Sequence, residues 1–432
     1  MDIIDIALFI FYSIFFYIIS SKNKNNYNKR IYTIAFGVKI IGSILASYLT
    51  YYVNPESSDS FVLYFTKGTM FYNLILKDID NIKYLYASPE STIFENLNGT
   101  NELLQSKANF LIVKIVTIIS FLCFGKYFTL GLFFSFFSLT GLWKLFQFFS
   151  KLISKYSNYF FVIILITPNI VIWSCGMLKD PICIGALGWL TYLGHEIFIE
   201  KKYKLIKILL LLTFTYTIFI VKFYIILAYL PPFVYFLIIE QIKIKPIKLS
   251  IVLTTVILVV SMFTIIVYQY GDVFEKYAFA TLLENLQEQQ GNMAMAEGGS
   301  SYSLGIELDG TINSLIKIAP LAFVATFFRP FIWESHNLLE LFTAIESSIM
   351  IFFCIYVLLK VGIHNFFYTA FHNVVVFYSL TFAIIFGIFV GATTLNFGTL
   401  VRYKMPCIPF FIISFMLILK SNQKFTTKIK IK

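Results

Sequence analysis

Charged side chains are scarce in this chain, and their scarcity excludes most soluble folds. Asp, Glu, Lys and Arg make up 13% of its 432 residues, whereas 58% of the residues are hydrophobic. A soluble domain of this length has no core large enough to bury so much apolar surface. Lipid is therefore the expected solvent, and the sequence predicts an all-α, polytopic membrane protein.

Cysteine and histidine are also rare, and neither forms a metal-ligand pattern. The five cysteines include no CxxC pair, and the four histidines show no HExxH spacing. We therefore expect the cysteines to be small buried hydrophobes and assign no residue to a metal site, although metal dependence stays open. No glycine-rich nucleotide-binding loop is visible, and we expect no cofactor.

Apolar segments fill most of the chain. Thirteen candidate spans are Ile3–Ser20, Ile31–Val53, Phe110–Gly125, Phe128–Phe149, Tyr159–Trp173, Pro181–Ile199, Leu205–Val221, Phe223–Ile239, Leu249–Tyr268, Ile312–Phe328, Leu338–Gly362, Val374–Ala392 and Pro406–Leu419. Several are shorter than the ~20 residues that cross a bilayer as a helix. We predict about 11–13 membrane helices in one integral-membrane domain, residues 1–432, with the shorter runs tilted, dipping or on the surface.

Lysine-rich loops set the predicted orientation. The loops at 22–30, 151–155, 201–207 and 243–248 and the tail at 420–432 carry clustered Lys. The positive-inside bias places these segments in the cytoplasm. The net charge of +11 therefore indicates orientation, and we expect no nucleic-acid partner.

If all lysine-rich loops lie in the cytoplasm, the number of membrane crossings between them has the wrong parity in two regions. One apolar run in each region should therefore not cross the membrane. We choose Phe110–Gly125, which contains a lysine, and Ile312–Phe328, which contains a lysine and a proline. Two sizeable loops then lie outside: 54–108, with surface helices, and 269–336, with a re-entrant or interfacial helix. The short segments 174–180 and 393–405 join them on the outer face.

An acidic segment directly follows the second span. It contains Glu56 and Asp59. A carboxylate at the membrane boundary can act as general base on an acceptor hydroxyl. Alternatively, Ser58 or Asp59 caps a surface helix that runs through Tyr64.

A second polar turn holds Lys179 and Asp180 before Pro181. The two charges form a local ion pair, with Pro181 starting the next helix, or Lys179 faces a phosphate. We leave both interpretations open.

Arg329, Trp333 and Glu334 lie close together at the end of an apolar run. They suit an aromatic anchor at the interface, or Arg329 binds a lipid phosphate bidentately. Glu346 lies inside the next run and needs a partner.

Arg402 and Lys404 precede the last span on the predicted outer face, against the positive-inside bias. They suit an anionic head group. The loop 269–311 ends in a Gly- and Ser-rich stretch, which either covers a site or is a solvated linker.

Three short motifs resemble GT-C type glycosyltransferases that use polyprenyl-phosphate sugars. They are Asp59-Ser60 with Tyr64 and Gly68, Pro168-Asn169 with Trp173-Ser174, and Arg402-Tyr403 with Pro406 and Pro409. Polysaccharide polymerases of the O-antigen and capsule type are similar in their many spans and outer-face arginines. The chain departs from the GT-C pattern by an extra N-terminal hairpin, residues 1–53, and by the lack of an adjacent acidic pair, which argues against a metal-using variant.

The sequence thus predicts a glycosyltransferase in a bacterial cytoplasmic (inner) membrane with its active face outward. The expected partners are membrane lipid, a polyprenyl-linked sugar donor and a glycan, lipid or protein acceptor. Asp59 is the expected base. The residues expected to bind the substrate or its phosphate are Arg402, Lys404, Arg329, Lys179 and Tyr64. Four acidic residues are expected to support the site: Glu56, Asp180, Glu334 and Glu346. An O-antigen or exopolysaccharide polymerase or ligase, and a transporter or flippase of lipid-linked sugars, remain alternatives.

Overall fold

Helices dominate this computed structural model, which describes residues 1–22, 24–53, 55, 58–87, 106–244, 287–288, 291, 301–305, 309, 311–336 and 338–429. Within those residues, β pairing is limited to one antiparallel bridge between Ser301 and Asn396. The predicted all-α class is confirmed. The chain divides into two compact units, of which unit 1 is Met1–Ile197 with Lys201–Ile226 and unit 2 is Phe198–Glu200 with Leu227–Lys432.

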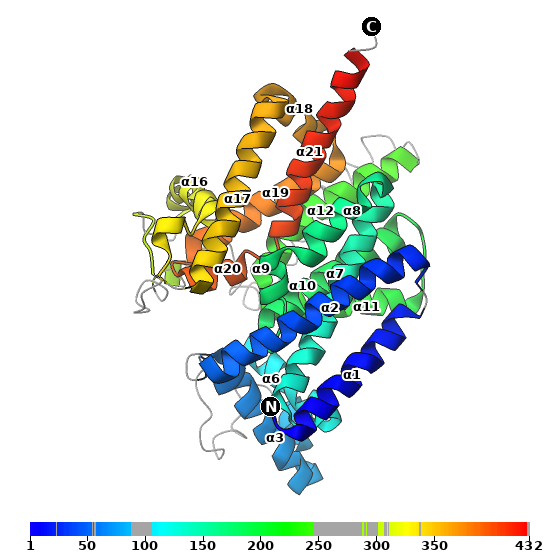
Figure 1. Ribbon diagram of the computed structural model, residues 1–432, viewed down its shortest axis with the longest axis vertical. Helices are drawn as coiled ribbons and strands as arrows, with labels where there is room; N and C mark the ends of the chain where they lie inside the picture. Colours follow the sequence, from blue (N-terminus) through cyan, green and yellow to red (C-terminus); the bar gives the residue numbers. More distant parts are fainter. Residues whose placement is uncertain are drawn as a thin grey trace, which may run out of the picture. The chain divides into compact units, whose positions relative to one another are not determined.

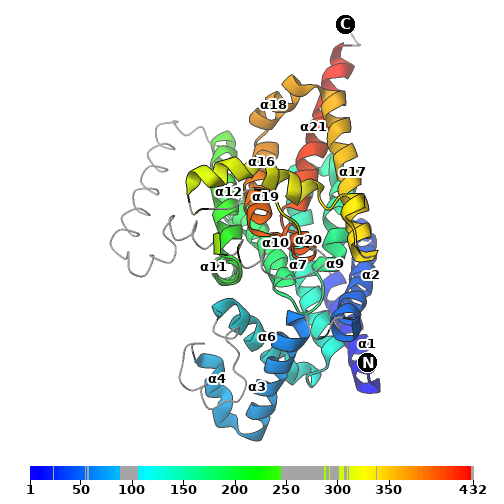
Figure 2. The ribbon, with the colours of Figure 1, turned by 90° about the vertical axis from the view of Figure 1, so that its left-hand side faces the viewer.

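Unit 1 contains the helices of the first half of the chain (Figure 1). They are α1 (Ile3–Ser21), α2 (Asn26–Tyr48), α3 (Thr66–Lys77), α4 (Lys83–Tyr86), α6 (Lys107–Cys123), α7 (Tyr127–Leu152), α8 (Ser157–Phe161), α9 (Pro168–Trp173), α10 (Lys179–Phe198) and α11 (Leu205–Val221). Short π turns cover Leu49–Val53, Ser60–Phe65 and Val162–Ile166, and 3₁₀ turns cover Ile79–Ile82 and Ser154–Tyr156. Figure 2 shows α3, α4 and α6 gathered together in this unit.

Polar residues at the helix ends explain where the first helices begin and end. The Asp2 carboxylate accepts a hydrogen bond from the Asp5 amide at 2.7 Å and starts α1. Asn25 caps α2 in the same way, three residues ahead of its donor. α6 ends where Phe124 and Gly125 adopt left-handed φ angles of 54° and 63°, a backbone conformation typical of helix C-termini.

Close packing of α7 against α10 positions the ends of α10. A Cβ atom added at Gly141 on α7 would lie 1.9 Å from the carbonyl oxygen of Gly185 on α10. Gly188 meets the Gly141 carbonyl oxygen in the same way, at 2.0 Å. These helices therefore touch through their backbones, which only glycine permits at this separation.

Unit 2 contains the second half of the chain. Its helices are α12 (Phe223–Ile244), which begins in unit 1, α16 (Ile312–Phe328), α17 (Leu338–Val361), α18 (Ile363–His372), α19 (Val374–Thr393), α20 (Phe397–Tyr403) and α21 (Ile408–Ile429), with a 3₁₀ turn at Ile332–Glu334. Buried aromatic side chains hold it together. The hydroxyl of Tyr378 on α19 donates to that of Tyr229 on α12 at 2.8 Å, and both rings are fully buried.

The chain is a polytopic membrane protein. The described residues contain six helices long and apolar enough to cross a membrane, or seven if the bent pair α20 and α21 forms one span. This count is below the 11–13 helices expected, because α11 and α16 are shorter apolar helices and the expected span Tyr159–Trp173 is divided among α8, a π turn and α9. The expected span Leu249–Tyr268 and most of the loop 269–311 lie outside the described residues.

Candidate functional site

Asp59 lies at the start of the π turn Ser60–Phe65, a few residues after the span that ends at Val53. Its side chain is exposed and makes no capping hydrogen bond to that turn. The turn begins instead from the Ser58 carbonyl, which accepts from the amides of Phe61 and Val62 at 3.0 and 2.9 Å. The predicted helical turn through Tyr64 is therefore present with Asp59 at its N-cap position, but the Asp59 side chain makes no capping hydrogen bond to that turn.

Asp59 belongs to a group of four charged residues, Asp59, Lys179, Asp180 and Lys222, which we call the Asp180 cluster. Lys222 Nζ lies 2.6 Å from Asp180 Oδ1, and the two side chains are only 6% and 1% exposed. Lys179 interacts electrostatically with the other three residues. Lys179 and Asp180 interact electrostatically, and Asp180 also accepts a hydrogen bond from Lys222; whether Lys179 faces a phosphate stays a prediction.

Lys222 was missed as a functional candidate, although the sequence carries a signal for it. It separates two apolar helices, α11 and α12, with no other charge nearby on either side. A lysine in such surroundings requires a counter-charge. The identity of that counter-charge is not a local property, because Asp180 lies 42 residues earlier in the chain.

Tyr64, another predicted residue of the first outer segment, is used in packing. Tyr64 is 1% exposed, and its hydroxyl donates to Asn109 Oδ1 at 3.2 Å. This places Tyr64 in the packing between the π turn, α3 and α6 rather than on a ligand-accessible surface. Glu56 lies outside the described residues.

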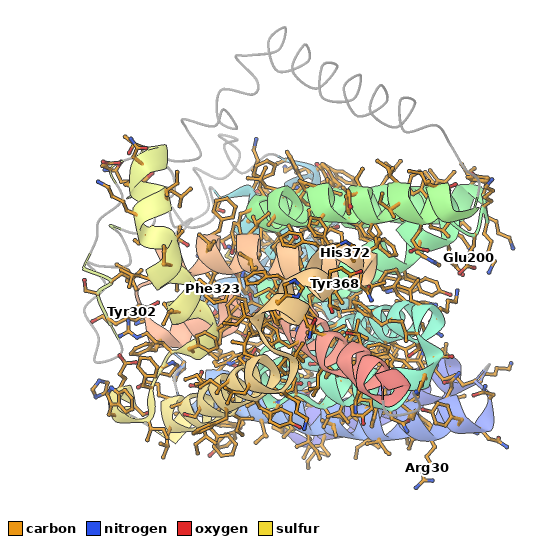
Figure 3. All side chains as sticks on the ribbon, turned by 90° about the horizontal axis from the view of Figure 1, so that it is seen from above. Arg30, Glu200, Tyr302, Phe323, Tyr368 and His372 are labelled. Atoms are coloured by element: carbon orange, nitrogen blue, oxygen red, sulfur yellow. The ribbon has the colours of Figure 1, made fainter. Side chains whose placement is uncertain are left out.

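Unit 2 holds a second polar group around Arg329 at the end of α16. Its Nε donates to both carboxylate oxygens of Glu334, at 3.0 and 3.1 Å. Its guanidinium lies 4.3 Å from the Tyr302 ring, labelled in Figure 3, and 5.2 Å from the Phe397 ring. Burial raises the pKa of the Tyr302 phenol, so this hydroxyl stays protonated and donates to the Thr394 carbonyl oxygen at 2.6 Å.

Lys404 and Glu346 belong to the same polar group. Lys404 Nζ donates to the Arg329 carbonyl oxygen at 3.1 Å and to Ser347 Oγ at 3.5 Å, and its side chain is buried. Glu346, which was expected to need a partner, interacts electrostatically with Lys404. Arg402 lies half-buried on the neighbouring helix α20. The contacts bring Arg329, Glu334, Glu346 and Lys404 together; phosphate binding by these cations stays a prediction.

Of the two polar groups, the Asp180 cluster is the better candidate for a catalytic site. It combines one exposed carboxylate with a lysine, beside an ion pair whose two charges offset each other. A carboxylate can accept a proton, and a nearby ammonium can stabilise an anion that forms during a reaction. Comparison of the chain with protein-family models, with curated proteins and with solved structures gave no match.

Proposed function

We propose that this protein is a membrane glycosyltransferase that uses a sugar donor linked to a polyprenyl phosphate. The observation that supports this proposal is the electrostatic interaction of Asp59 with Lys179, which adjoins the buried Asp180–Lys222 pair. Because Asp180 and Lys222 offset each other, Asp59 and Lys179 form a base and a cation at the end of a membrane span. A lipid-linked donor presents its phosphate at that depth.

In the proposed reaction, an acceptor hydroxyl oxygen attacks the anomeric carbon of the donor sugar. A new glycosidic C–O bond forms while the bond between the anomeric carbon and the phosphate oxygen breaks. Asp59 takes the hydroxyl proton, and the electron pair of the broken bond stays on the polyprenyl phosphate. Lys179 offsets the charge that develops there.

The cations of unit 2 are not assigned a step in this reaction. Arg329 already shares its charge with Glu334, and the Lys404 amine donates to a carbonyl and a hydroxyl oxygen. We therefore assign the phosphate contact to Lys179, and phosphate binding by Arg402 stays a prediction. The proposed site faces outward from a bacterial cytoplasmic membrane, because the lysine-rich loops are assigned to the inside.

The proposal is tested by replacing Asp59 in the cells that make this protein. Asp59→Asn should abolish transfer by at least about 100-fold, since a general base contributes roughly 10²–10⁴ to a rate, whereas Asp59→Glu should retain part of it. Asp80→Asn is the matched control, because Asp80 is also an exposed carboxylate of the same segment. The measurement is the profile of surface glycans and of lipid-linked sugars at equal protein abundance. Normal glycans in Asp59→Asn cells would remove Asp59 from the reaction.

The buried Asp180–Lys222 pair also favours a second candidate, a transporter or flippase of lipid-linked sugars, because ionisable residues at membrane depth often mark transport pathways. Purified protein in liposomes separates the two activities. Transfer of sugar to an acceptor without movement of the lipid between leaflets supports the transferase, and the reverse result supports the transporter. A polymerase or ligase would instead accumulate a lipid-linked oligosaccharide when Asp59 is replaced.

A further inference from the structure

A second charged group lies at the other end of α10. Glu196 follows Asp180 by 16 residues on this helix, a distance of about 24 Å at the helical rise. Its carboxylate lies 2.6 Å from Lys207 Nζ, 3.4 Å from Lys151 Nζ and 3.7 Å from Lys202 Nζ. Three lysines therefore converge on one carboxylate: Lys151 from α7, Lys202 from the loop between α10 and α11, and Lys207 from α11.

A fourth lysine lies deeper along α7. Lys144 Nζ is 4.3 Å from the centre of the Tyr192 ring and 5.0 Å from that of Trp189. It donates to Gln147 Oε1 at 3.0 Å, and it interacts electrostatically with Glu196, Lys151 and Lys207. We call Lys144, Lys151, Lys202 and Lys207 the Lys144 cluster.

The Lys144 cluster brings four positive charges to one carboxylate, Glu196. Three of the ammonium groups lie within 3.7 Å of Glu196, and the fourth, that of Lys144, interacts with the same carboxylate electrostatically. Lys144 and Lys207 are half-buried, whereas Lys151 and Lys202 are exposed. Like charges gathered this closely repel one another, and a bound anion would reduce that repulsion.

We propose that the Lys144 cluster binds the phosphate of an anionic phospholipid head group. Depth favours a lipid over a soluble phosphate, because Lys144 and Lys151 lie about two turns, roughly 10 Å, apart along a membrane-spanning helix. Their amines therefore extend from the membrane surface toward the acyl region. Trp189 and Tyr192, whose rings contact Lys144, are the side chains typical of that interface. Basic pockets between membrane helices recognise such head groups.

This site is separate from the proposed transferase site, since the two lie at opposite ends of α10. The test uses the purified full-length protein in mild detergent, with phosphatidylglycerol as the anionic probe and phosphatidylcholine as the neutral one. Native mass spectrometry counts the lipids that stay bound. The wild type should retain one phosphatidylglycerol in preference to phosphatidylcholine, and a roughly 10-fold excess of inorganic phosphate should not displace it.

Charge-neutral variants locate the site. The triple variant Lys144→Gln, Lys151→Gln, Lys207→Gln should bind phosphatidylglycerol roughly 100-fold more weakly, about fivefold for each lysine. The matched control removes one cation that directly follows α1 and two from the start of α2, by Lys22→Gln, Lys29→Gln and Arg30→Gln, and should bind like the wild type.

Glu196→Gln is an independent variant that should bind the lipid more tightly, because it removes the competing carboxylate. It keeps the test decisive if the triple variant does not fold. Equal lipid retention by the triple variant and its control, or no gain in Glu196→Gln, would overturn the proposal. Displacement by inorganic phosphate would overturn the choice of a lipid.

Discussion

Removing either partner of the Asp180–Lys222 pair should strongly destabilise the protein. The two charges meet at 2.6 Å between the start of α10 and the residue after α11, and both side chains are almost completely buried. Loss of one partner leaves the other charge buried without its hydrogen-bonded counter-ion. Breaking a buried pair in this way costs about 3–5 kcal/mol.

The charges around the pair predict which of the two single substitutions destabilises the protein more. In Lys222→Met, Asp180 keeps the electrostatic attraction of Lys179, so the cost should lie near 3 kcal/mol, the lower end of that range. In Asp180→Asn, Lys222 remains beside Lys179, which has the same charge. That variant should lose about 5 kcal/mol, the upper end of the range. The double variant should lose less than the sum, because it leaves neither charge of the pair behind.

The assay is reversible unfolding of the purified protein in mixed micelles with increasing SDS, followed by tryptophan fluorescence. Lys207→Met is the matched control at the other end of α10. Its side chain is 20% exposed, and Lys151 and Lys202 also contact Glu196, so it should cost no more than about 1 kcal/mol. The reasoning fails if Lys222→Met and Asp180→Asn destabilise the protein no more than Lys207→Met does.

Two further pairs of variants test packing and orientation. Gly141→Ala should destabilise unit 1 by about 3 kcal/mol, because its Cβ would lie 1.9 Å from the Gly185 carbonyl oxygen. The control is Gly37→Ala on α2, where an added Cβ meets no atom within 4 Å. This control should be neutral or stabilising in the same unfolding assay. For orientation, a membrane-impermeant maleimide should label Asp80→Cys in intact cells but Lys202→Cys only after lysis, against a low background because the native cysteines are buried. The opposite labelling would reverse the proposed topology.

The positions of many helices could be predicted from the sequence. Leu205–Val221 was predicted with the bounds that α11 has, and Val374–Ala392 differs from α19 by one residue. Such agreement is expected, because charges and capping residues mark the ends of apolar runs. The prediction that the five cysteines are buried is confirmed as well, since small apolar side chains follow the packing of their helices.

The partners within the candidate sites could not be predicted. Glu346 was expected to need a counter-charge, but its neighbour Lys404 lies on another segment. Lys144 was overlooked inside an apolar run, although its aromatic and charged neighbours give it a defined place. A local pattern reveals that a buried charge needs a partner; only the packing of distant helices decides which residue supplies it.

The charges at the two ends of α10 also fix how this helix pairs with α11. Asp180 and Glu196 are 16 residues apart on α10, and their partners Lys222 and Lys207 are 15 residues apart along α11 and its end. Both separations correspond to about 23–24 Å, so both pairs form together only when the helices run antiparallel in this register. A slip of one turn, about 5.4 Å, would break both pairs at once. The same ion pairs that set the register therefore hold Lys179 near Asp59 at one end of α10 and gather the Lys144 cluster at the other.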